Sequence, residues 1–412
     1  MALLTWFRRL SHQAESYRWH ALGLTTLGQA AANILSAGFG PLAPLLQTDF
    51  QISRAEIGLI ATAISLTAAP SALFGGRAAD RVGERRVLIL SGLVTALAAL
   101  AISRSSSFWG LLASCLLLGL GNGIQNPAGS AAVMRWFPPR QRGVAMGIRQ
   151  TGVPLGGILA ASVAPVLALA YGWRTAYVLG GVMAFVGAAL VFVAYYDPPR
   201  QAAAGSTAPR SLRNLTRDKR IWWLGLIFNC QLFTQYSVST YFVLFLHEAL
   251  DTPVVGAAAL LAVVNGVAMA ARIGWGLLSD RRFQGRRKPV LLLIVLLTVC
   301  STLCAAALPR QTPFLLVTGL AVLLGASAFA WTGVLGTLVI ETAGRESAGS
   351  AISLVQVLAT PASLLSPPLF GLLTDRSGTY RAAWLALALV GALGLFALRQ
   401  VTEDAAEIVR LT

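Results

Sequence analysis

Long apolar runs alternate with short polar segments along the whole 412-residue chain. A bilayer core needs roughly 20 consecutive apolar residues for each helical span, and the runs are long enough for twelve such helices. We expect these helices at residues 19–46, 55–76, 85–103, 108–134, 143–170, 173–196, 220–247, 254–279, 289–308, 313–340, 347–374 and 381–400. The pattern therefore predicts an all-α membrane protein with twelve transmembrane helices.

The longest polar interruption falls between the sixth and seventh predicted helices, at Asp197–Arg220. It contains a Pro-Pro pair, an Ala-Gly-Ser-Thr stretch and several arginines, a composition typical of a flexible linker. We therefore predict an N-terminal six-helix bundle at residues 1–196, a cytoplasmic linker at 197–219 and a C-terminal six-helix bundle at 220–412.

The two predicted bundles resemble each other in sequence at an offset of 200–207 residues. The matching positions are Gly76, Asp80 and Arg81 with Gly276, Asp280 and Arg281; Gln29 and Asn33 with Gln231 and Gln235; Gln150 with Gln356; and Trp173-Arg174 with Tyr380-Arg381. Four matches in the same order indicate an internal duplication, and two six-helix repeats are a frequent architecture of secondary transporters. We therefore expect the two six-helix bundles to be pseudo-symmetric.

Composition and charge narrow the class of protein. Hydrophobic side chains make up 56% of the chain and charged ones 12%, which excludes an ordinary soluble domain and a disordered chain. A net charge of +16 would suggest nucleic acid as the partner of a soluble protein. Here it follows from topology, because 24 basic residues fall in cytoplasmic segments and six outside when the N-terminus is placed inside. We expect both termini in the cytoplasm, a bacterial inner (plasma) membrane location and no nucleic-acid partner.

The loop between the second and third predicted helices carries a polar motif, Gly76-x-x-x-Asp80-Arg81-x-Gly83-x-Arg85-Arg86. Gly76 would let its helix approach a neighbour closely. Asp80 needs a partner, such as local arginines or the start of an adjacent helix, because the dipole at the C-terminal end of its own helix disfavours a carboxylate. The motif resembles the signature of the major facilitator superfamily. That resemblance implies a latch to the helix at 347–374, which joins the two halves when the carrier opens outward.

The second copy of this motif contains Gly276, Asp280 and Arg281, with two extra residues before Gly285. It is the second candidate latch. For both copies the alternative is a basic loop that only fixes the topology of the chain.

Arg272 is the most informative single residue, because it lies eight residues before Asp280, about 12 Å of helix inward. Charged side chains at such a depth are rare and normally face the bundle interior or a water-filled pathway. Asn265 lies on the same face. The run Arg272–Arg281 resembles helix eight of oxalate/formate-type and monocarboxylate carriers, and the resemblance implies that Arg272 binds a substrate carboxylate. The alternative is that Arg272 snorkels to the inner surface or pairs structurally.

Arg149 is the second cation inside a predicted span. Gly152 and Gly156 follow it by three and seven residues, so we expect one shared face suited to close helix contact, with a kink at Pro154. The surrounding run partly resembles the helix-five motif of drug/proton antiporters. Arg149 and Arg272 could jointly face an anion, while a gating or structural role for Arg149 is the alternative.

Neutral polar residues complete the set of candidate substrate contacts. They are Gln29, Asn33, Asn122, Asn126, Gln231, Gln235, Asn265 and Trp331. The superfamily resemblance implies that the first, fourth, seventh and tenth helices, which hold all of these but Asn265, line a central cavity. Hydrogen bonding between helices is the competing role for each residue.

No acidic residue falls in the middle of a predicted span, which argues against a carrier of cations. His12, His20 and His247 lie outside the span centres, and the sequence carries no metal-binding or catalytic motif. We therefore predict no enzyme, cofactor or metal, but an alternating-access transporter of a small organic anion, with carboxylates as the favoured class. The alternatives are efflux of amphipathic drugs or metabolites, and a non-transporting sensor with a carrier fold. The expected partners are the substrate and the lipid bilayer, and the expected state is a monomer.

Overall fold

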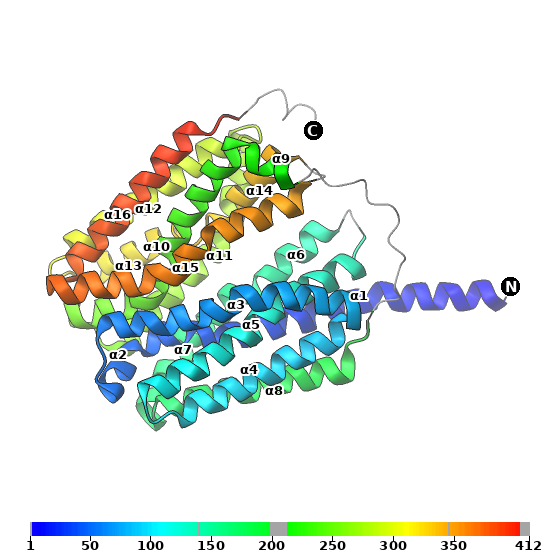
Figure 1. Cartoon of the computed structure of the whole chain (residues 1–412), viewed down its shortest axis with the longest axis horizontal. Helices are drawn as coiled ribbons and strands as arrows, with labels where there is room; N and C mark the ends of the chain where they lie inside the picture. The colour runs from blue at the N-terminus through cyan, green and yellow to red at the C-terminus, as the bar shows by residue number, and fades with distance from the viewer. Residues whose placement is uncertain (1, 139–140, 198–211, 345–346, 404–412) are drawn as a thin grey trace. The chain divides into compact units, whose positions relative to one another are not determined.

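The computed structural model describes residues 2–138, 141–197, 212–344 and 347–403, with side chains except at 2–16, Asp80, 212–214 and 348–349. Within these ranges the chain forms helices and no strand (Figure 1). The helices are α1 (Ala2–Ala37), α2 (Phe39–Phe50), α3 (Arg54–Val82), α4 (Glu84–Arg104), α5 (Phe108–Trp136), α6 (Arg142–Gln150), α7 (Gly152–Tyr171), α8 (Trp173–Ala194), α9 (Leu212–Arg217), α10 (Lys219–Leu250), α11 (Val254–Arg282), α12 (Arg287–Ala307), α13 (Phe314–Ala326), α14 (Thr332–Ala343), α15 (Ala348–Ser377) and α16 (Tyr380–Gln400).

The predicted all-α membrane fold is confirmed. In the described residues, nine stretches are long and apolar enough to cross a membrane, with α6 and α7 forming one of them. The other three predicted spans correspond to α1, to α10 and to the pair α13 and α14. Of these helices, α13 and α14 are apolar but each is short. Each of the twelve predicted spans therefore has a helical counterpart.

Three predicted helices are interrupted, at Gly38, at Thr151 and at residues 327–331. Proline explains the position of two of these breaks. Pro41 and Pro154 each occupy the third position of the following helix, α2 or α7, where a backbone N–H has no intrahelical partner in any case. The expected kink at Pro154 is therefore a break three residues earlier, at Thr151.

Contacts divide the chain into two compact units, one of Met1–Phe39 with Ala63–Arg200 and the other of Gly40–Thr62 with Gln201–Thr412. In the first unit, α4 lies along α5 and α8, while α1 packs on α5, α7 and α8 (Figure 1). In the second unit, α12 lies along α16, while α10 packs on α14, α15 and α16. These pairings recur in the order that the sequence repeat predicts. The predicted boundary at 197–219 stays a prediction.

Glycine brings α3 and α5 into close contact inside the first unit. A Cβ atom on Gly119 would stand 2.1 Å from the backbone oxygen of Ile64, and one on Gly123 would stand 2.2 Å from that of Ala68. Thr67 then reaches across to donate a hydrogen bond of 2.6 Å to the backbone oxygen of Leu116. Small residues four apart thus allow the backbones to approach, as in other membrane helix pairs.

The close approach expected at Gly76 belongs instead to Gly75. A Cβ atom on Gly75 would stand 2.9 Å from Cα of Ile124, whereas one on Gly76 would lie 3.7 Å from Cβ of Pro127, an ordinary contact. The reason is helical geometry, because each residue turns by about 100° around the helix axis and only Gly75 points directly at α5.

Candidate substrate-binding site and conformational contacts

Arg149, the second-to-last residue of α6, is completely buried in the first unit. Its Nη1 donates to Oδ1 of Asn126 at 3.1 Å and to Oγ of Ser130 at 3.0 Å, and its Nη2 donates to the backbone oxygen of Asn126 at 3.0 Å. Gly129 makes room for the guanidinium, because a Cβ atom there would stand 2.6 Å from Nε. The structure thus brings together two predicted site residues, Arg149 and Asn126.

The charge of Arg149 is held by neutral groups. Among the described contacts its partners are an amide, a hydroxyl and a backbone carbonyl, and its Nε is buried with no hydrogen-bond partner. A buried charge is costly unless it is paired. The Nε of Arg149 therefore lacks an acceptor, and its positive charge lacks a negative partner among the described contacts.

The single face expected for Arg149, Gly152 and Gly156 is wrong. Gly152 and Gly156 pack α7 against α1, where Cβ atoms would stand 2.8 and 2.6 Å from the backbone oxygens of Thr26 and Ala30. Arg149 instead points at α5, because the break at Thr151 ends the helical register between them.

The polar residues of α1 and α5 leave acceptors unused. Nε2 of Gln29 donates to Oε1 of Gln150 at 3.2 Å, while Oε1 of Gln29 and Oδ1 of Asn122 are buried without a hydrogen-bond partner in the described part of the chain. Asn33 is half-buried, and its Cβ would lie 2.8 Å from a Cβ on Gly156. Gln29 and Asn33 therefore lie on the surface of α1 that contacts α6 and α7.

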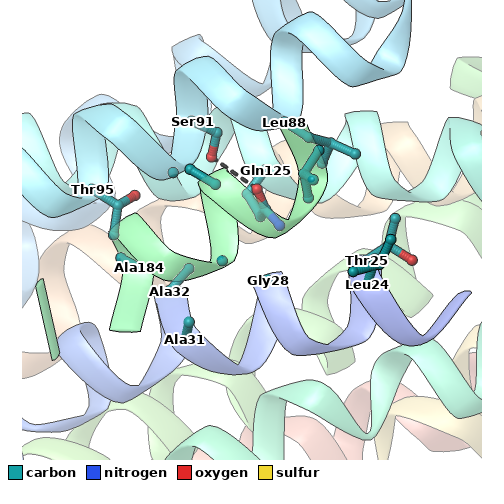
Figure 2. Close-up of a pocket in the computed structure, with 14 residues that line it drawn as sticks. Leu24, Thr25, Gly28, Ala31, Ala32, Leu88, Ser91, Thr95, Gln125 and Ala184 are labelled. Atoms are coloured by element: carbon teal, nitrogen blue, oxygen red, sulfur yellow. Dashed lines mark hydrogen bonds between the residues drawn. The ribbon is translucent and has the colours of Figure 1, made fainter. Parts of the chain in front are cut away.

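A small cavity lies inside the first unit between α1, α4, α5 and α8 (Figure 2). Figure 2 shows Ser91 hydrogen-bonded to Gln125, with Gly28 on the neighbouring helix. The cavity measures about 20 Å³, which is room for one water molecule and far below the roughly 300 Å³ of a small-molecule site. It is not where an organic anion would bind.

In the second unit, Arg272 lies on α11 beside the break between α13 and α14. Its Nε and Nη2 donate to the backbone oxygen of Phe329 at 3.1 and 3.0 Å. One turn further along α11, Nε1 of Trp275 donates to the backbone oxygen of Ala326 at 2.6 Å. The two side chains therefore satisfy carbonyls that the interrupted helix leaves without intrahelical partners.

This contact supports the alternative that Arg272 has a structural role. Two donors of its guanidinium, Nε and Nη2, already bond a backbone carbonyl of the protein. A guanidinium carries five N–H donors, and only Nε and Nη2 have a hydrogen-bond partner among the described residues. The Nη1 end is left for another acceptor.

The remaining candidates of the second unit lie at this break, on α10 or on α11. Nε1 of Trp331 donates to Oε1 of Gln235 at 3.1 Å. Nε2 of Gln231 donates to Oγ1 of Thr298 at 3.3 Å, and its Oε1 is buried without a partner in the described part. Asn265 donates to the backbone oxygen of Leu261 in its own helix, at 3.0 Å. The unused Oε1 of Gln231 repeats that of Gln29, its counterpart in the other half.

The second copy of the loop motif has its own ion network. Arg287, the first residue of α12, pairs with Asp280 at 2.5 Å and with Glu341, near the end of α14, at 3.3 Å. Asp280 thus finds the local arginine that its position at the end of a helix requires, although the sequence did not single out Arg287. Arg281 is exposed, and a Cβ atom on Gly276 would meet nothing within 4 Å.

Both copies of the motif end on a glycine in the turn just before the next helix. Gly83 has φ +94° and Gly285 has φ +80°. Oδ1 of Asp197 accepts from the backbone N–H of Arg85 at 2.8 Å, and Glu403 accepts from those of Arg287 and Lys288 at 2.6 and 2.8 Å. A carboxylate after α8, and another after α16, thus stabilises the start of α4 or α12.

The side chain of Asp80 lies outside the described residues, although its backbone is part of α3. The latch predicted for Gly76, Asp80, Arg81, Gly83 and Arg85 therefore stays a prediction.

Sequence reasoning missed a polar network around Arg54, the first residue of α3. Its Nη2 lies 2.7 Å from Oε2 of Glu248 and its Nη1 lies 3.3 Å from Oδ1 of Asp375. The hydroxyl of Tyr380 also donates to Glu248 at 2.7 Å, and that of Tyr241 donates to the backbone oxygen of Arg54 at 2.6 Å. A signal was present, since these charges all lie at the predicted outer ends of spans. Of these residues only Arg54 entered the count of basic residues that predicts the topology.

Comparison with known proteins places this arrangement in a family. The Major Facilitator Superfamily profile matches residues 25–367 and 275–410. The chain is 26% identical to the hexuronate transporter of Bacillus subtilis over 86% of this chain and 87% of that protein. It is also 26% identical to a probable sulfoacetate transporter of Cupriavidus necator, over 90% and 91% of the two chains.

The fold is shared with a bacterial homologue of the human lysosomal transporter Spinster, solved in an inward-facing and unoccupied conformation. The TM-score is 0.75 at 19% identity, covering 96% of this chain and 95% of that one. Within the described residues, no group of three or more metal-binding side chains gathers. The relatives named above are transporters rather than enzymes, and the chain is a multi-pass membrane protein that belongs to the Major Facilitator Superfamily.

Proposed function

We propose that this protein is an alternating-access transporter of a small organic anion, with carboxylates as its substrate class. The observation that carries the proposal is Arg149, a completely buried cation whose described partners are all neutral. The named relatives support the class, since hexuronate and sulfoacetate are both organic anions. The proposed location is the bacterial inner membrane with both termini in the cytoplasm.

Arg149, which is buried, and Arg272, which is half-buried, are each adjacent to a helix break. Arg149 precedes the break at Thr151, and Arg272 bonds the carbonyl of Phe329 inside the break between α13 and α14. Discontinuous helices are a common way for secondary transporters to build substrate sites, because the freed backbone groups and polar side chains gather there. The two arginines are therefore the groups that we assign to the anion.

A carboxylate suits the donors that remain. The unused Nε of Arg149 and the Nη1 end of Arg272 are both guanidinium donors, and charge-assisted hydrogen bonds to a carboxylate are among the strongest in proteins. The negative substrate would also balance a charge that is expensive inside a membrane. Gln29 and Gln231, with one unused acceptor each, would bind hydroxyl groups of the substrate.

The test is counterflow in proteoliposomes with labelled glucuronate, labelled sulfoacetate and the lipophilic cation tetraphenylphosphonium. We expect counterflow of at least one anion and none of the cation. Arg149→Gln and Arg272→Gln should each reduce anion counterflow about tenfold or more, the size expected for a lost charge-assisted bond. The exposed Arg376 offers a matched control, and Arg376→Gln should transport as the wild type does.

Two outcomes contradict the proposal in different ways. Counterflow of tetraphenylphosphonium without any anion would favour drug efflux. Thermal stabilisation by an anion without counterflow of any compound would favour a sensor.

A further inference from the structure

A basic pocket opens on the surface of the first unit, where the end of α3, the start of α4 and the end of α8 meet. Its volume is about 590 Å³, and the described residues that line it are Arg81, Val82, Arg85, Arg86, Ile89, Phe192 and Asp197. Arg85 and Arg86 are its cations at the start of α4, and Asp197 is the described carboxylate of its lining. The pocket shares none of these residues with the candidate substrate site.

The geometry of Arg85 fixes a positive charge in this pocket. Its Nη2 donates to the backbone oxygen of Phe192, and its guanidinium carbon lies 5.4 Å from the ring of Phe192 and 5.7 Å from that of Tyr196. Its Nε is buried without a hydrogen-bond partner in the described part of the chain. The guanidinium is therefore held in place by carbonyl and aromatic groups, which do not neutralise it.

Two carboxylates near Arg85 whose side chains the structure describes, Asp197 and Glu84, are already engaged. Asp197 accepts from the backbone N–H of Arg85 at 2.8 Å, at the positive end of the α4 dipole. Glu84 is completely buried and forms an ion pair with Arg135 at 3.0 Å. Arg85 and Arg86 therefore carry more positive charge than Asp197, the described carboxylate of the pocket, can balance, and they are available to an external anion.

An apolar stripe leads directly away from the arginines. On α4, the exposed residues Leu90, Leu93, Leu97 and Leu100 continue the face of Arg86 at steps of three or four residues. On α8, the exposed Phe185 lies two turns before Phe192. A surface of this kind in a membrane protein contacts acyl chains, whereas a site for a soluble anion needs no such continuation.

We infer that this pocket binds the headgroup of an anionic phospholipid, with the phosphodiester on Arg85 and Arg86 and the acyl chains along the exposed leucines of α4. Basic pockets at the cytoplasmic ends of membrane helices are suited to such headgroups, and the predicted topology places this end of α4 in the cytoplasmic leaflet. The site does not depend on the identity of the transported substrate.

The experiment measures lipid binding to the purified full-length protein by native mass spectrometry and thermal stabilisation. Dioleoyl phosphatidylglycerol is compared with dioleoyl phosphatidylcholine, and glycerol 3-phosphate and inorganic phosphate test whether a soluble anion is enough. We expect the wild type to prefer phosphatidylglycerol, and the soluble anions to have no effect at the same concentration. The double variant Arg85→Gln/Arg86→Gln should bind phosphatidylglycerol about tenfold less tightly.

Matched variants separate a defined site from general charge attraction. Arg282→Gln/Arg399→Gln removes two exposed arginines at the ends of α11 and α16 and should bind the lipid as the wild type does. Arg86→Gln alone changes an exposed side chain without threatening the fold and should give part of the loss. The proposal is overturned by equal binding of the two lipids, by equal stabilisation with inorganic phosphate, or by equal losses in the two double variants.

Discussion

Arg54 at the start of α3 and Glu248 near the end of α10 form an ion pair, with 2.7 Å between Nη2 and Oε2. Asp375 of α15 adds a second carboxylate on Nη1, and its Oδ2 also accepts from the backbone N–H of Ala55 at 2.9 Å. Gly371 lets α15 come this close, because a Cβ atom there would stand 2.4 Å from the backbone oxygen of Arg54. The first turn of α3 is thus fixed in the second unit, while its last turns, from residue 63 on, belong to the first.

This network predicts how α3 responds to a change of charge. Arg54→Gln removes the only cation that the described contacts place between Glu248 and Asp375, so the two carboxylates should repel each other. Because the pair is partly exposed, we expect a loss of about 1–2 kcal/mol in stability. Thermal unfolding of the purified protein measures it, and a cysteine at Ser53 should react faster with a membrane-impermeant reagent in the variant.

The charge-reversed double variant Arg54→Glu/Glu248→Arg is the control for this prediction. It restores one opposite-charge pair and should recover part of the lost stability, while Arg381→Gln, at an exposed position of α16, should leave the unfolding temperature unchanged. An Arg54→Gln variant as stable and as poorly labelled as the wild type would show that the network does not hold α3.

The helices could be predicted because the cost of placing polar groups in a bilayer acts on every residue of a span. The partners of the charges could not, because a side chain reaches a neighbour only after the helices have packed. Arg149 and Asn126 were both singled out as polar residues within spans, but their contact depends on the room that Gly129 leaves. Arg54 and Arg287 were read as topology markers, since nothing local shows which carboxylate each will meet.

Gly129 gives a direct test of the Arg149 site. Gly129→Ala places a methyl group 2.6 Å from Nε and Nη2 of Arg149, so the guanidinium must move from Asn126. We expect a destabilisation of about 1–3 kcal/mol, the usual cost of overpacking, together with weaker anion binding. Gly147→Ala is the matched control on α6, because its Cβ would meet nothing within 4 Å and should change neither property.

Two helix-linking turns offer a test of the predicted topology. Most of the predicted linker, residues 198–211, lies outside the described residues, whereas Gln284 and Arg310 are described and exposed. Arg310 holds the pKa of Asp251 below its usual range through hydrogen bonds of 2.6 and 2.9 Å. With Cys300 and Cys304 replaced by serine, Gln284→Cys should react only from the cytoplasm and Arg310→Cys only from outside. Labelling of position 284 in intact cells would reverse the orientation.

The role of Arg272 can be divided into a structural part and a binding part, because the helix break provides a matched control. Arg272→Gln loses the paired bonds to Phe329, and Trp275→Phe loses the bond to Ala326 at the same break. Both variants leave a carbonyl without its donor, so each should lower stability by about 1–3 kcal/mol. Arg272→Lys keeps the charge but not the planar fork of donors and should bind the anion more weakly than the wild type.

Anion-induced thermal stabilisation then separates the two parts, because mass action ties the shift to affinity. If the Nη1 end of Arg272 binds the substrate, Arg272→Gln loses most of the stabilisation, while Trp275→Phe keeps the full shift from a lower starting temperature. Equal shifts in wild type and Arg272→Gln would mean that the guanidinium serves only the carbonyl of Phe329. The anion would then depend on Arg149 alone, because it is the other cation within the membrane spans and its Nε remains without a partner among the described residues.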